Sequence, residues 1–306
     1  MITKTINNTC SYILIAGPVC EAIACILTVV FDSDRERTDM DVQNKVCLIT
    51  GAATGIGSGV ARALLDKGAK HVAVLDVNVE QGKALEKELN AKHGNNKMTF
   101  FKCDVTTNEL HTAFDETVKT FGYIDIVVNN AGIMNDHPTA IEKEIAINVS
   151  ALITGSLKAY NLMRKDQGGK GGTIINISSI VGLMQSYLLP VYSATKSAVL
   201  QFSNCLGKSE NFTRSDVRVI AICFGITDTN LIKGRIGCID DRLEDELLVA
   251  LKKFPFQSID SAVQGLITAL ESGSSGSSWL VASNKPAEDI TNNVRKAYEI
   301  LFQGVL

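Results

Sequence analysis

The sequence lacks several features that mark particular classes of protein. Its histidines, His71, His93, His111 and His137, do not cluster, and its eight cysteines show no metal-ligand spacing, so we expect no metal site. The cysteines also form no pattern typical of a disulfide framework. Positive charge is not in excess, since the formal net charge is −3, and this gives no reason to expect a nucleic-acid partner. With 306 residues, 45% of them hydrophobic, the chain is long enough for a large core.

A glycine-rich turn follows directly on a short apolar run. Residues 45–50 are typical of a buried strand, Gly51, Gly55 and Gly57 come next, and a helical pattern covers 57–67. This order is typical of dinucleotide phosphate binding, although an ordinary turn is the alternative. Gly51 permits a tight turn, Gly55 lets the backbone approach the pyrophosphate, and Gly57 lets the helix pack closely. The helix N-terminus would attract the phosphate.

The second predicted strand, 71–76, ends in an acid. Asp76 lies 25 residues after Gly51, where a carboxylate can accept hydrogen bonds from both ribose hydroxyls of an adenosine. The same charge would repel a 2′-phosphate, and neither Ala52 nor Ala53 offers a cation to hold one. The sequence therefore predicts NAD rather than NADP, unless Asp76 is only a turn residue at the strand end.

Tyr192 and Lys196 lie four residues apart, and Ser179 lies thirteen residues before the tyrosine. Four residues make about one helical turn, so the phenol and the ammonium can share a face. A fixed cation favours the phenolate, which turns the phenol into a proton shuttle usable near neutral pH. Ser179 can then hydrogen-bond the oxygen whose proton moves. The same spacing is also common on solvated helix faces, but here it follows a predicted phosphate site.

Together these motifs resemble the short-chain dehydrogenase/reductase family, over roughly residues 42–285. The matching motifs, in the family's order, are Thr50-Gly51-x-x-x-Gly55-x-Gly57, Asn129-Asn130-Ala131-Gly132, Asn148, Ser179 and Tyr192-x-x-x-Lys196. Within the family, the chain looks similar to the group of 15-hydroxyprostaglandin dehydrogenases and insect-type alcohol dehydrogenases, on the stretches 131–148, 175–184 and 279–287.

The resemblance implies an NAD-dependent oxidoreductase that interconverts a secondary alcohol and a ketone by hydride transfer. Tyr192 would be the general acid/base, Lys196 would acidify it and hold the nicotinamide ribose, and Ser179 would orient the substrate oxygen. Asn148 would sit in a helix distortion and hold a water that links Lys196 to solvent. The scarcity of carboxylate-binding pairs favours an apolar or lipid-like substrate. A non-catalytic NAD-binding or scaffold protein is the alternative.

The resemblance also implies where the cofactor binds. The expected residues are Gly51, Thr54, Gly55, Ile56, Gly57, Asp76, Asp104, Val105, Asn130, Ala131, Gly132, Tyr192, Lys196, Ile226 and Thr229. One position departs from the family, since Phe224 stands where proline is usual. Proline would fix the backbone, so we expect phenylalanine to leave this segment freer and bulkier, with consequences for cofactor affinity and product release.

Strand-like and helix-like runs alternate along the chain. The strands are expected near residues 45–50, 71–76, 98–102, 124–129, 173–177, 218–223 and 278–281, and the helices over 57–67, 78–93, 107–121, 141–165, 191–208, 242–253 and 259–271. The alternation predicts an α/β fold, a single Rossmann-type doubly wound parallel sheet of about seven strands flanked by helices. Ligands should then bind at the carboxyl ends of the strands.

We expect one NAD-binding domain over residues 40–306. Within it, residues 226–258 mix apolar and charged side chains and are typical of an amphipathic substrate lid, with a plain surface helix as the alternative. The family usually pairs through two long helices, here about 141–165 and 191–208. The resemblance therefore implies a homodimer or a homotetramer.

Residues 1–39 form an apolar extension before this domain. Residues 11–31 carry one charge, Glu21, and are long enough to span a membrane or to act as a signal peptide. Glu21 would be costly in hydrocarbon, and Gly17-Pro18 interrupts a helix. The extension could also be a non-native start, since Met40 resembles a natural beginning. We favour a cytoplasmic protein, with membrane anchoring through residues 11–31 as the alternative.

Overall fold

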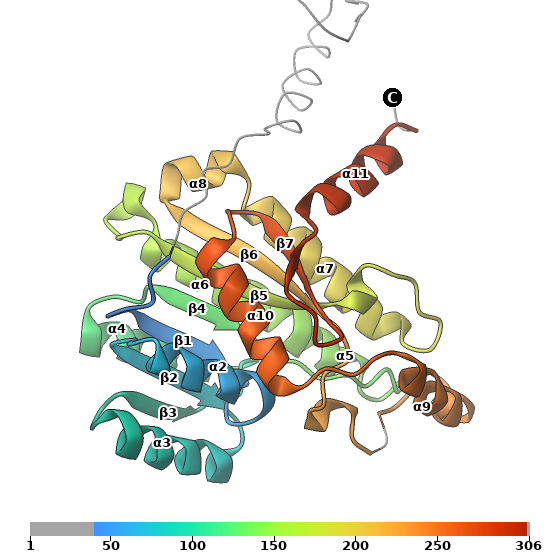
Figure 1. The fold of residues 1–306 in the computed structure, drawn as a ribbon, viewed down its shortest axis with the longest axis horizontal. Helices are drawn as coiled ribbons and strands as arrows, with labels where there is room; N and C mark the ends of the chain where they lie inside the picture. The colour runs from blue at the N-terminus through green and yellow to red at the C-terminus, as the bar shows by residue number, and fades with distance from the viewer. Residues whose placement is uncertain (1–39, 235, 305–306) are drawn as a thin grey trace, which may run out of the picture. The chain divides into compact units, whose positions relative to one another are not determined.

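The protein is described from a computed structural model, in which residues 40–234 and 236–304 are placed well enough to describe. Eight strands form one sheet in the order β3-β2-β1-β4-β5-β6-β7-β8 (Figure 1). Their bounds are β1 Val46–Thr50, β2 His71–Asp76, β3 Met98–Lys102, β4 Ile126–Asn129, β5 Gly172–Ser179, β6 Val217–Phe224, β7 Ser277–Val281 and β8 Glu288–Asp289. All neighbouring pairs are parallel except β7 with β8. The predicted doubly wound parallel sheet is confirmed, and β8 is added at its edge.

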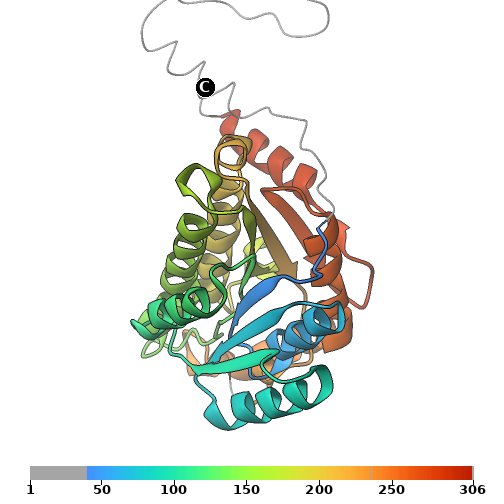
Figure 2. The same ribbon diagram turned by 90° about the vertical axis from the view of Figure 1, so that its left-hand side faces the viewer.

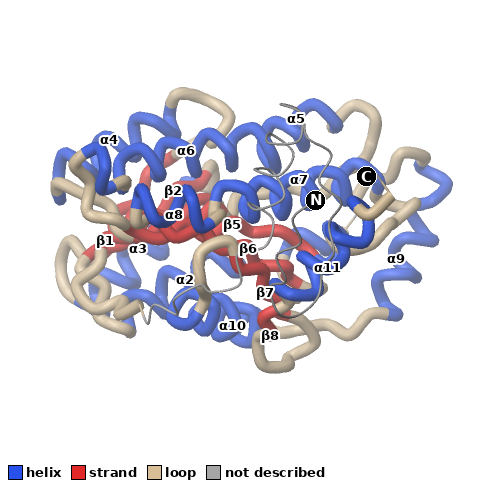
Figure 3. Tube along the Cα trace, turned by 90° about the horizontal axis from the view of Figure 1, so that it is seen from above, coloured by secondary structure: helices blue, strands red, loops and turns tan. Residues whose placement is uncertain are grey.

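Helices cover both faces of the sheet (Figure 3). One face carries α2 Gly55–Asp66, α3 Val79–His93 and α10 Ile259–Ser272, and the other carries α4 Glu109–Phe121, α6 Leu152–Met163 and α7 Pro190–Leu206. The remaining helices are α5 Ile141–Ile145, the π-helical turn η1 Ala146–Ala151, α8 Ser209–Ser215, α9 Glu244–Lys253 and α11 Thr291–Phe302. Figure 2 shows the same layers from the side, with the green helices and the blue and orange helices on opposite sides of the strands.

The core forms two layers because successive strand residues point to opposite faces. In β1, Cys47 and Ile49 pack toward α2 and α10, whereas Leu48 packs toward α4 and α6. Every residue of β1 is buried, as expected for a parallel strand covered on both sides. The strand order reverses between β1 and β4, and their carboxyl ends therefore flank the crevice where α/β proteins bind ligands.

The structure differs from the prediction mainly in its helices. The run 141–165 is not one helix, because a π-helical turn separates α5 from α6. The elements α8, β8 and α11 were not predicted. The first two are short, whereas α11 has an apolar helical period at Val294, Tyr298 and Leu301 that the sequence prediction missed. No helix among residues 40–234 and 236–304 combines the length and hydropathy needed to cross a bilayer. The predictions for residues 1–39 lie outside the described residues.

Candidate active site

The glycine-rich turn lies at the carboxyl end of β1, where α2 begins. Gly51 and Gly55 both have positive φ, +62° and +59°, a conformation that residues with a Cβ rarely adopt. At Gly51 a Cβ would lie 2.7 Å from the Cα of Ala131, and at Gly57 it would lie 2.6 Å from the carbonyl oxygen of Gly51. The turn therefore packs against the end of β4 and the first turn of α2, which leaves no room for a side chain at Gly51 or Gly57.

Hydrogen bonds hold the ends of β1 and β4 together at this turn. The Asn130 amide donates to the carbonyl oxygens of Thr50 at 3.0 Å and of Gly51 at 2.8 Å. The Thr50 hydroxyl accepts the backbone N–H groups of Asn130 and Ala131, both at 3.1 Å. The family motif that begins at Asn129 thus fixes the shape of the turn. Asn129 itself points away, into a buried network where its amide donates to Asn176 at 2.9 Å.

Asp76 reaches the same turn from the end of β2. One carboxylate oxygen accepts the N–H of Ala53 at 2.9 Å, and the other accepts the N–H of Asn78 at 2.9 Å. The side chain is half-buried, so part of the carboxylate stays accessible beside the turn. Its predicted bond to a ribose stays a prediction.

The two residues expected beside the adenine lie after β3. Asp104 accepts the N–H of Thr106 at 3.0 Å and its hydroxyl at 2.7 Å, and these bonds lower the pKa of the Asp104 carboxyl. Val105 packs against the core cluster that contains Leu110. The loop is therefore held by its own contacts, and the adenine contact stays a prediction.

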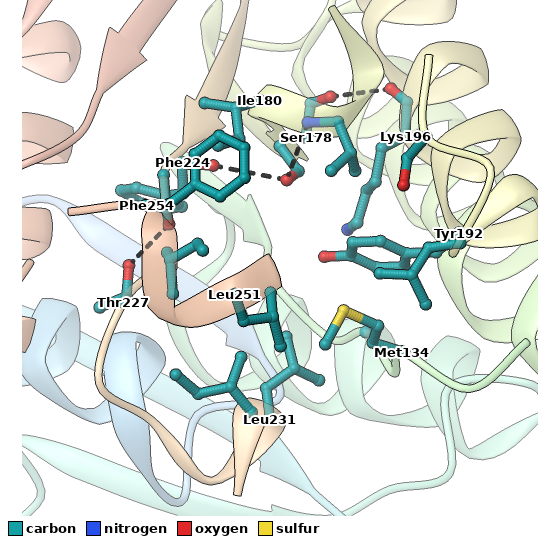
Figure 4. A pocket seen from close by; sticks show the side chains of 18 of the residues that line it. Met134, Ser178, Ile180, Tyr192, Lys196, Phe224, Thr227, Leu231, Leu251 and Phe254 are labelled. Atoms are coloured by element: carbon teal, nitrogen blue, oxygen red, sulfur yellow. Dashed lines mark hydrogen bonds between the residues drawn. The ribbon is translucent and has the colours of Figure 1, made fainter. Parts of the chain in front are cut away.

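Tyr192 and Lys196 lie on one face of α7, and both are nearly buried, at 7% and 4% exposed. The Lys196 Nζ lies 5.5 Å from the centre of the Tyr192 ring and donates to the carbonyl oxygen of Ile177 at 3.0 Å. Ser179, at the end of β5, lines the same cavity as Tyr192, and its hydroxyl donates to the carbonyl oxygen of Phe224 at 3.4 Å. Figure 4 shows the phenol oxygen pointing into the cavity, with the lysine beside the ring. The structure thus brings all three predicted groups together.

Burial and two nearby acids act on the phenol. Burial raises the pKa of Tyr192, the charges of Glu144 and Asp136 raise it further, and the neighbouring Ser179 lowers it. Burial also lowers the pKa of Lys196 to about 8, against the opposing effect of Glu144. Desolvation and the two acids therefore oppose ionisation of the phenol, and the role of Lys196 in acidifying it stays a prediction.

Asn148 lies in the π-helical turn η1, so the predicted helix distortion is present. Its amide donates to the carbonyl oxygen of Ile133 at 2.8 Å, and its carbonyl accepts the N–H of Ile133 at 2.9 Å. A further bond of 3.2 Å runs to the Thr195 hydroxyl on α7. A Cβ on Gly132 would lie 3.3 Å from Asn148 Oδ1 and 3.5 Å from Lys196 Nζ. Asn148 thus holds the loop beside Lys196, and its water relay stays a prediction.

A largely apolar cavity of about 340 Å³ opens in front of the tyrosine and the serine (Figure 4). Of the predicted site residues, it is lined by Ile56, Asn130, Gly132, Ser179, Tyr192, Lys196, Ile226 and Thr229. The remaining ones, Gly51, Thr54, Gly55, Gly57, Asp76, Asp104, Val105, Ala131 and Asn148, are not part of its lining and lie around the ends of β1 to β4 and in η1.

Two segments contribute most of the apolar lining. The first is 226–254, within the predicted lid, which adds Leu231, Leu251 and Phe254 among others. The second is 180–189, including Met184 and Leu188, which the sequence prediction missed as substrate-facing. Its position between Ser179 and Tyr192 is the available signal, because a chain joining two site residues must pass beside the site.

Phe224 closes one wall of the cavity and does not loosen the backbone. It is the last residue of β6, where it pairs with Ser179 of β5 and Val281 of β7. The side chain is 5% exposed and packs in the core, and its carbonyl oxygen accepts the Ser179 hydroxyl at 3.4 Å. Pairing on both sides restrains the backbone at this residue, and the consequences of Phe224 for cofactor affinity and product release stay predictions.

The chain belongs to the short-chain dehydrogenase family, whose model matches residues 45–236. Among curated relatives, the 15-hydroxyprostaglandin dehydrogenase [NAD(+)] of Bos taurus is 42% identical over 195 residues, which are 63% of this chain and 72% of the relative. The protein of the same name from Rattus norvegicus is 36% identical over 237 residues, which are 76% of this chain and 88% of the relative.

Solved structures give the same family. A short-chain type dehydrogenase/reductase from Mycobacterium marinum superimposes with a TM-score of 0.67 at 27% identity, over 79% of this chain and 96% of that chain. A 3-ketoacyl-(acyl-carrier-protein) reductase from Brucella melitensis, complexed with NADH, has a TM-score of 0.65 at 22% identity, over 79% of this chain and 98% of that one. This second likeness concerns the fold alone.

Proposed function

We propose that this protein is an NAD-dependent oxidoreductase that interconverts a secondary alcohol and a ketone on an apolar substrate. The observation that carries the proposal is the meeting of Ser179, Tyr192 and Lys196 on one wall of an apolar cavity next to the glycine-rich turn. A protein that only binds NAD would not need this set of groups. The names of the curated relatives, which specify NAD(+), support the choice of cofactor.

The residues around the turn fit a dinucleotide. Gly51 and Gly57 let the turn pack closely, at positions where a Cβ would overlap neighbouring backbone, and Thr54 makes no side-chain cap on α2. The first N–H groups of the helix are thus available to a pyrophosphate. The Asp76 carboxylate beside the turn favours ribose hydroxyls over a 2′-phosphate. When bound, NAD supplies the acceptor and donor of hydride.

The chain's own groups would handle the proton. In alcohol oxidation, the phenolate form of Tyr192 accepts the hydroxyl proton and becomes the neutral phenol, while the Ser179 hydroxyl holds the substrate oxygen in place. Lys196 keeps its ammonium close to the phenol through its bond to Ile177, and its charge favours the phenolate that accepts the proton. In ketone reduction, the same phenol returns the proton to the substrate oxygen.

The substrate is proposed to be apolar because of the cavity wall. Among the described residues that line it, Lys196 is the single cation, and that ammonium already bonds a backbone carbonyl. Leucine, isoleucine, methionine and phenylalanine side chains make up most of the remainder. We propose that residues 226–258 act as the lid over this cavity, within an NAD-binding domain that spans residues 40–306.

The decisive test is Tyr192→Phe, which removes the phenol oxygen and keeps the ring. We expect turnover of secondary alcohols to fall at least about 100-fold, while NADH binding, followed by fluorescence, stays within about twofold. Tyr123→Phe is the matched control, since the hydroxyl of Tyr123 accepts a hydrogen bond from Lys70 at the surface and Tyr123 does not line the cavity. Full turnover in the Tyr192 variant would remove the proposed mechanism.

We further propose that the protein forms a homodimer or homotetramer through α6 and α7. Ile145, Leu157 and Leu162 on α5 and α6 are 42%, 43% and 38% exposed, more than apolar side chains of a core helix usually are. Sedimentation of Leu157→Lys against wild type tests the pairing, which predicts a shift toward monomer.

For the location, we propose the cytoplasm. The described cysteines, such as Cys47 and Cys223, are free thiols, which suits a reducing compartment. Membrane anchoring through residues 11–31 is the alternative. Recovery of the full chain in the membrane fraction of expressing cells would favour the anchor.

A further inference from the structure

A buried carboxyl group lies close to the proton-transfer groups and has no place in the mechanism described above. Glu144, on α5, is 0% exposed. One of its oxygens accepts the N–H of Asn135 at 3.3 Å. The other oxygen is buried and has no hydrogen-bond partner. A fully buried carboxyl group with an unpartnered oxygen is costly, so its presence calls for an explanation.

The neighbours of Glu144 connect it to the catalytic groups. It lies one helical turn before Asn148, which holds the loop beside Lys196. The residue after its partner Asn135 is Asp136, also 0% exposed, whose oxygens accept the N–H groups of Val191 at 2.6 Å and Tyr192 at 3.0 Å. Asp136 therefore caps the first turn of α7 from a distant loop. Neither acid is among the residues that line the substrate cavity.

We propose that Glu144 is a positioning residue for the proton transfer at Tyr192, a buried carboxyl group that sets the pH range in which the phenol works. The inference rests on the proposed function, because it concerns the same reaction. Glu144 does not line the substrate cavity. It acts through its charge alone, on a phenol and an ammonium that water does not screen.

The charged groups near Glu144 have opposing effects on its pKa. Asp136 lies in the loop that precedes α5, and Tyr192 and Lys196 lie on α7, the helix that packs against α5. Burial, followed by the like charge of Asp136, raises the pKa of Glu144 to about 7, while the Asn135 N–H and Lys196 lower it. Ionised Glu144 in turn raises the pKa of both Tyr192 and Lys196. Protonation of Glu144 therefore makes the phenol easier to ionise.

The substitution Glu144→Gln removes the charge and keeps the shape of the side chain, since a glutamine oxygen can still accept the Asn135 N–H. In alcohol oxidation, the acid limb of the kcat/KM profile should move to lower pH by about one unit, the low end of the effect of a neighbouring charge. The control is Glu142→Gln on the same helix, at an exposed position, and its profile should match wild type. A purely structural role for Glu144 would change stability without moving this limb.

A second measurement needs no substrate. The pKa of Glu144 is raised in the folded protein, from 4.5 to about 7, so its carboxyl group stabilises the fold below the lower value and loses this effect as the pH rises through the higher one. The melting temperature of Glu144→Gln minus that of wild type should therefore increase between about pH 5 and about pH 8. Glu142→Gln should show no such trend.

The outcomes separate the two proposals. An active wild type whose acid limb is unmoved by Glu144→Gln overturns this inference alone. A melting difference that stays constant with pH also overturns it, because Glu144 then titrates as an exposed acid. A wild type that turns over no alcohol and reduces no ketone overturns the proposed function, and the role of Glu144 with it.

Discussion

The two sides of the candidate site are built in different ways. The cofactor side, around Gly51 and Asp76, is fixed by backbone contacts and by hydrogen bonds between segments far apart in the chain. The substrate side consists of side chains from 180–189 and 226–254, and several of them, including Met184 and Phe254, remain 42% exposed. The cofactor side selects its ligand through a backbone turn that is held in one conformation. The substrate side selects its ligand through the size and polarity of side chains, which substitutions can change without altering the backbone.

This contrast predicts that the largest loss comes from adding a single methyl group on the cofactor side. In Gly51→Ala, the left-handed conformation alone costs about 1–2 kcal/mol, and the Cβ would also overlap the Cα of Ala131 at 2.7 Å. We expect NADH affinity to fall at least about 100-fold, because the turn must move. Fluorescence titration of the folded variant measures it.

The control for this variant is Gly122→Ala. Gly122 also has positive φ, +82°, but nothing lies within 4 Å of its Cβ position. Both variants bear the backbone strain, so the difference between them isolates the crowding at the turn. Equal cofactor affinity in the two variants would show that the close approach to Ala131 does not matter.

A smaller loss is expected from Asp76→Ala. The change removes an acceptor for Ala53 and the charge proposed to select ribose hydroxyls. We expect NAD affinity to fall about tenfold, and the preference for NAD over NADP to narrow, since hydrogen bonds to charged groups are worth about 1.5–3 kcal/mol. Glu80→Ala, an exposed acid at the start of α3, is the control. A wild-type protein that prefers NADP would contradict the assignment.

The smallest effect should come from the substrate side. Leu251→Ala enlarges the cavity and should raise KM for a long apolar alcohol by roughly fivefold, from the loss of about 1 kcal/mol of apolar contact. Cofactor affinity should not change. Val249→Ala on the same helix, at a side chain that is 55% exposed and outside the lining, should leave KM unaltered. Similar values for both variants would argue against α9 as part of the substrate site.

The sequence predicts the cofactor side better than the substrate side for a physical reason. A left-handed turn and a close approach each need a particular residue at a fixed position, so Gly51, Gly57 and Asp76 can be recognised from spacing. The sheet follows from apolar runs of strand length, and Asn148 was correctly expected in a distorted helix.

The acids behind the tyrosine could not be predicted in this way. Asp136 and Glu144 are residue types that usually lie at the surface, and their complete burial comes with tertiary contacts, of Glu144 with the Asn135 N–H and of Asp136 with the first turn of α7. Their effect on the pKa of Tyr192 could not be predicted for the same reason, since a pKa depends on every charge that the fold brings near. The mixed composition of 180–189 likewise gives no period from which its lining role follows.

The order of the strands has a consequence for how the chain acquires its fold. The Asn130 side-chain amide donates a hydrogen bond to the Gly51 carbonyl oxygen, although the two residues lie 79 positions apart in the chain. During synthesis, β1 and its turn leave the ribosome first and must wait for β4 before their contacts can close. Loop-closure entropy opposes such pairing until both strands are available, and parallel sheets with distant contacts form slowly. Mutations between β1 and β4 that favour early collapse should therefore lower the yield of folded protein even where they leave the final structure unchanged.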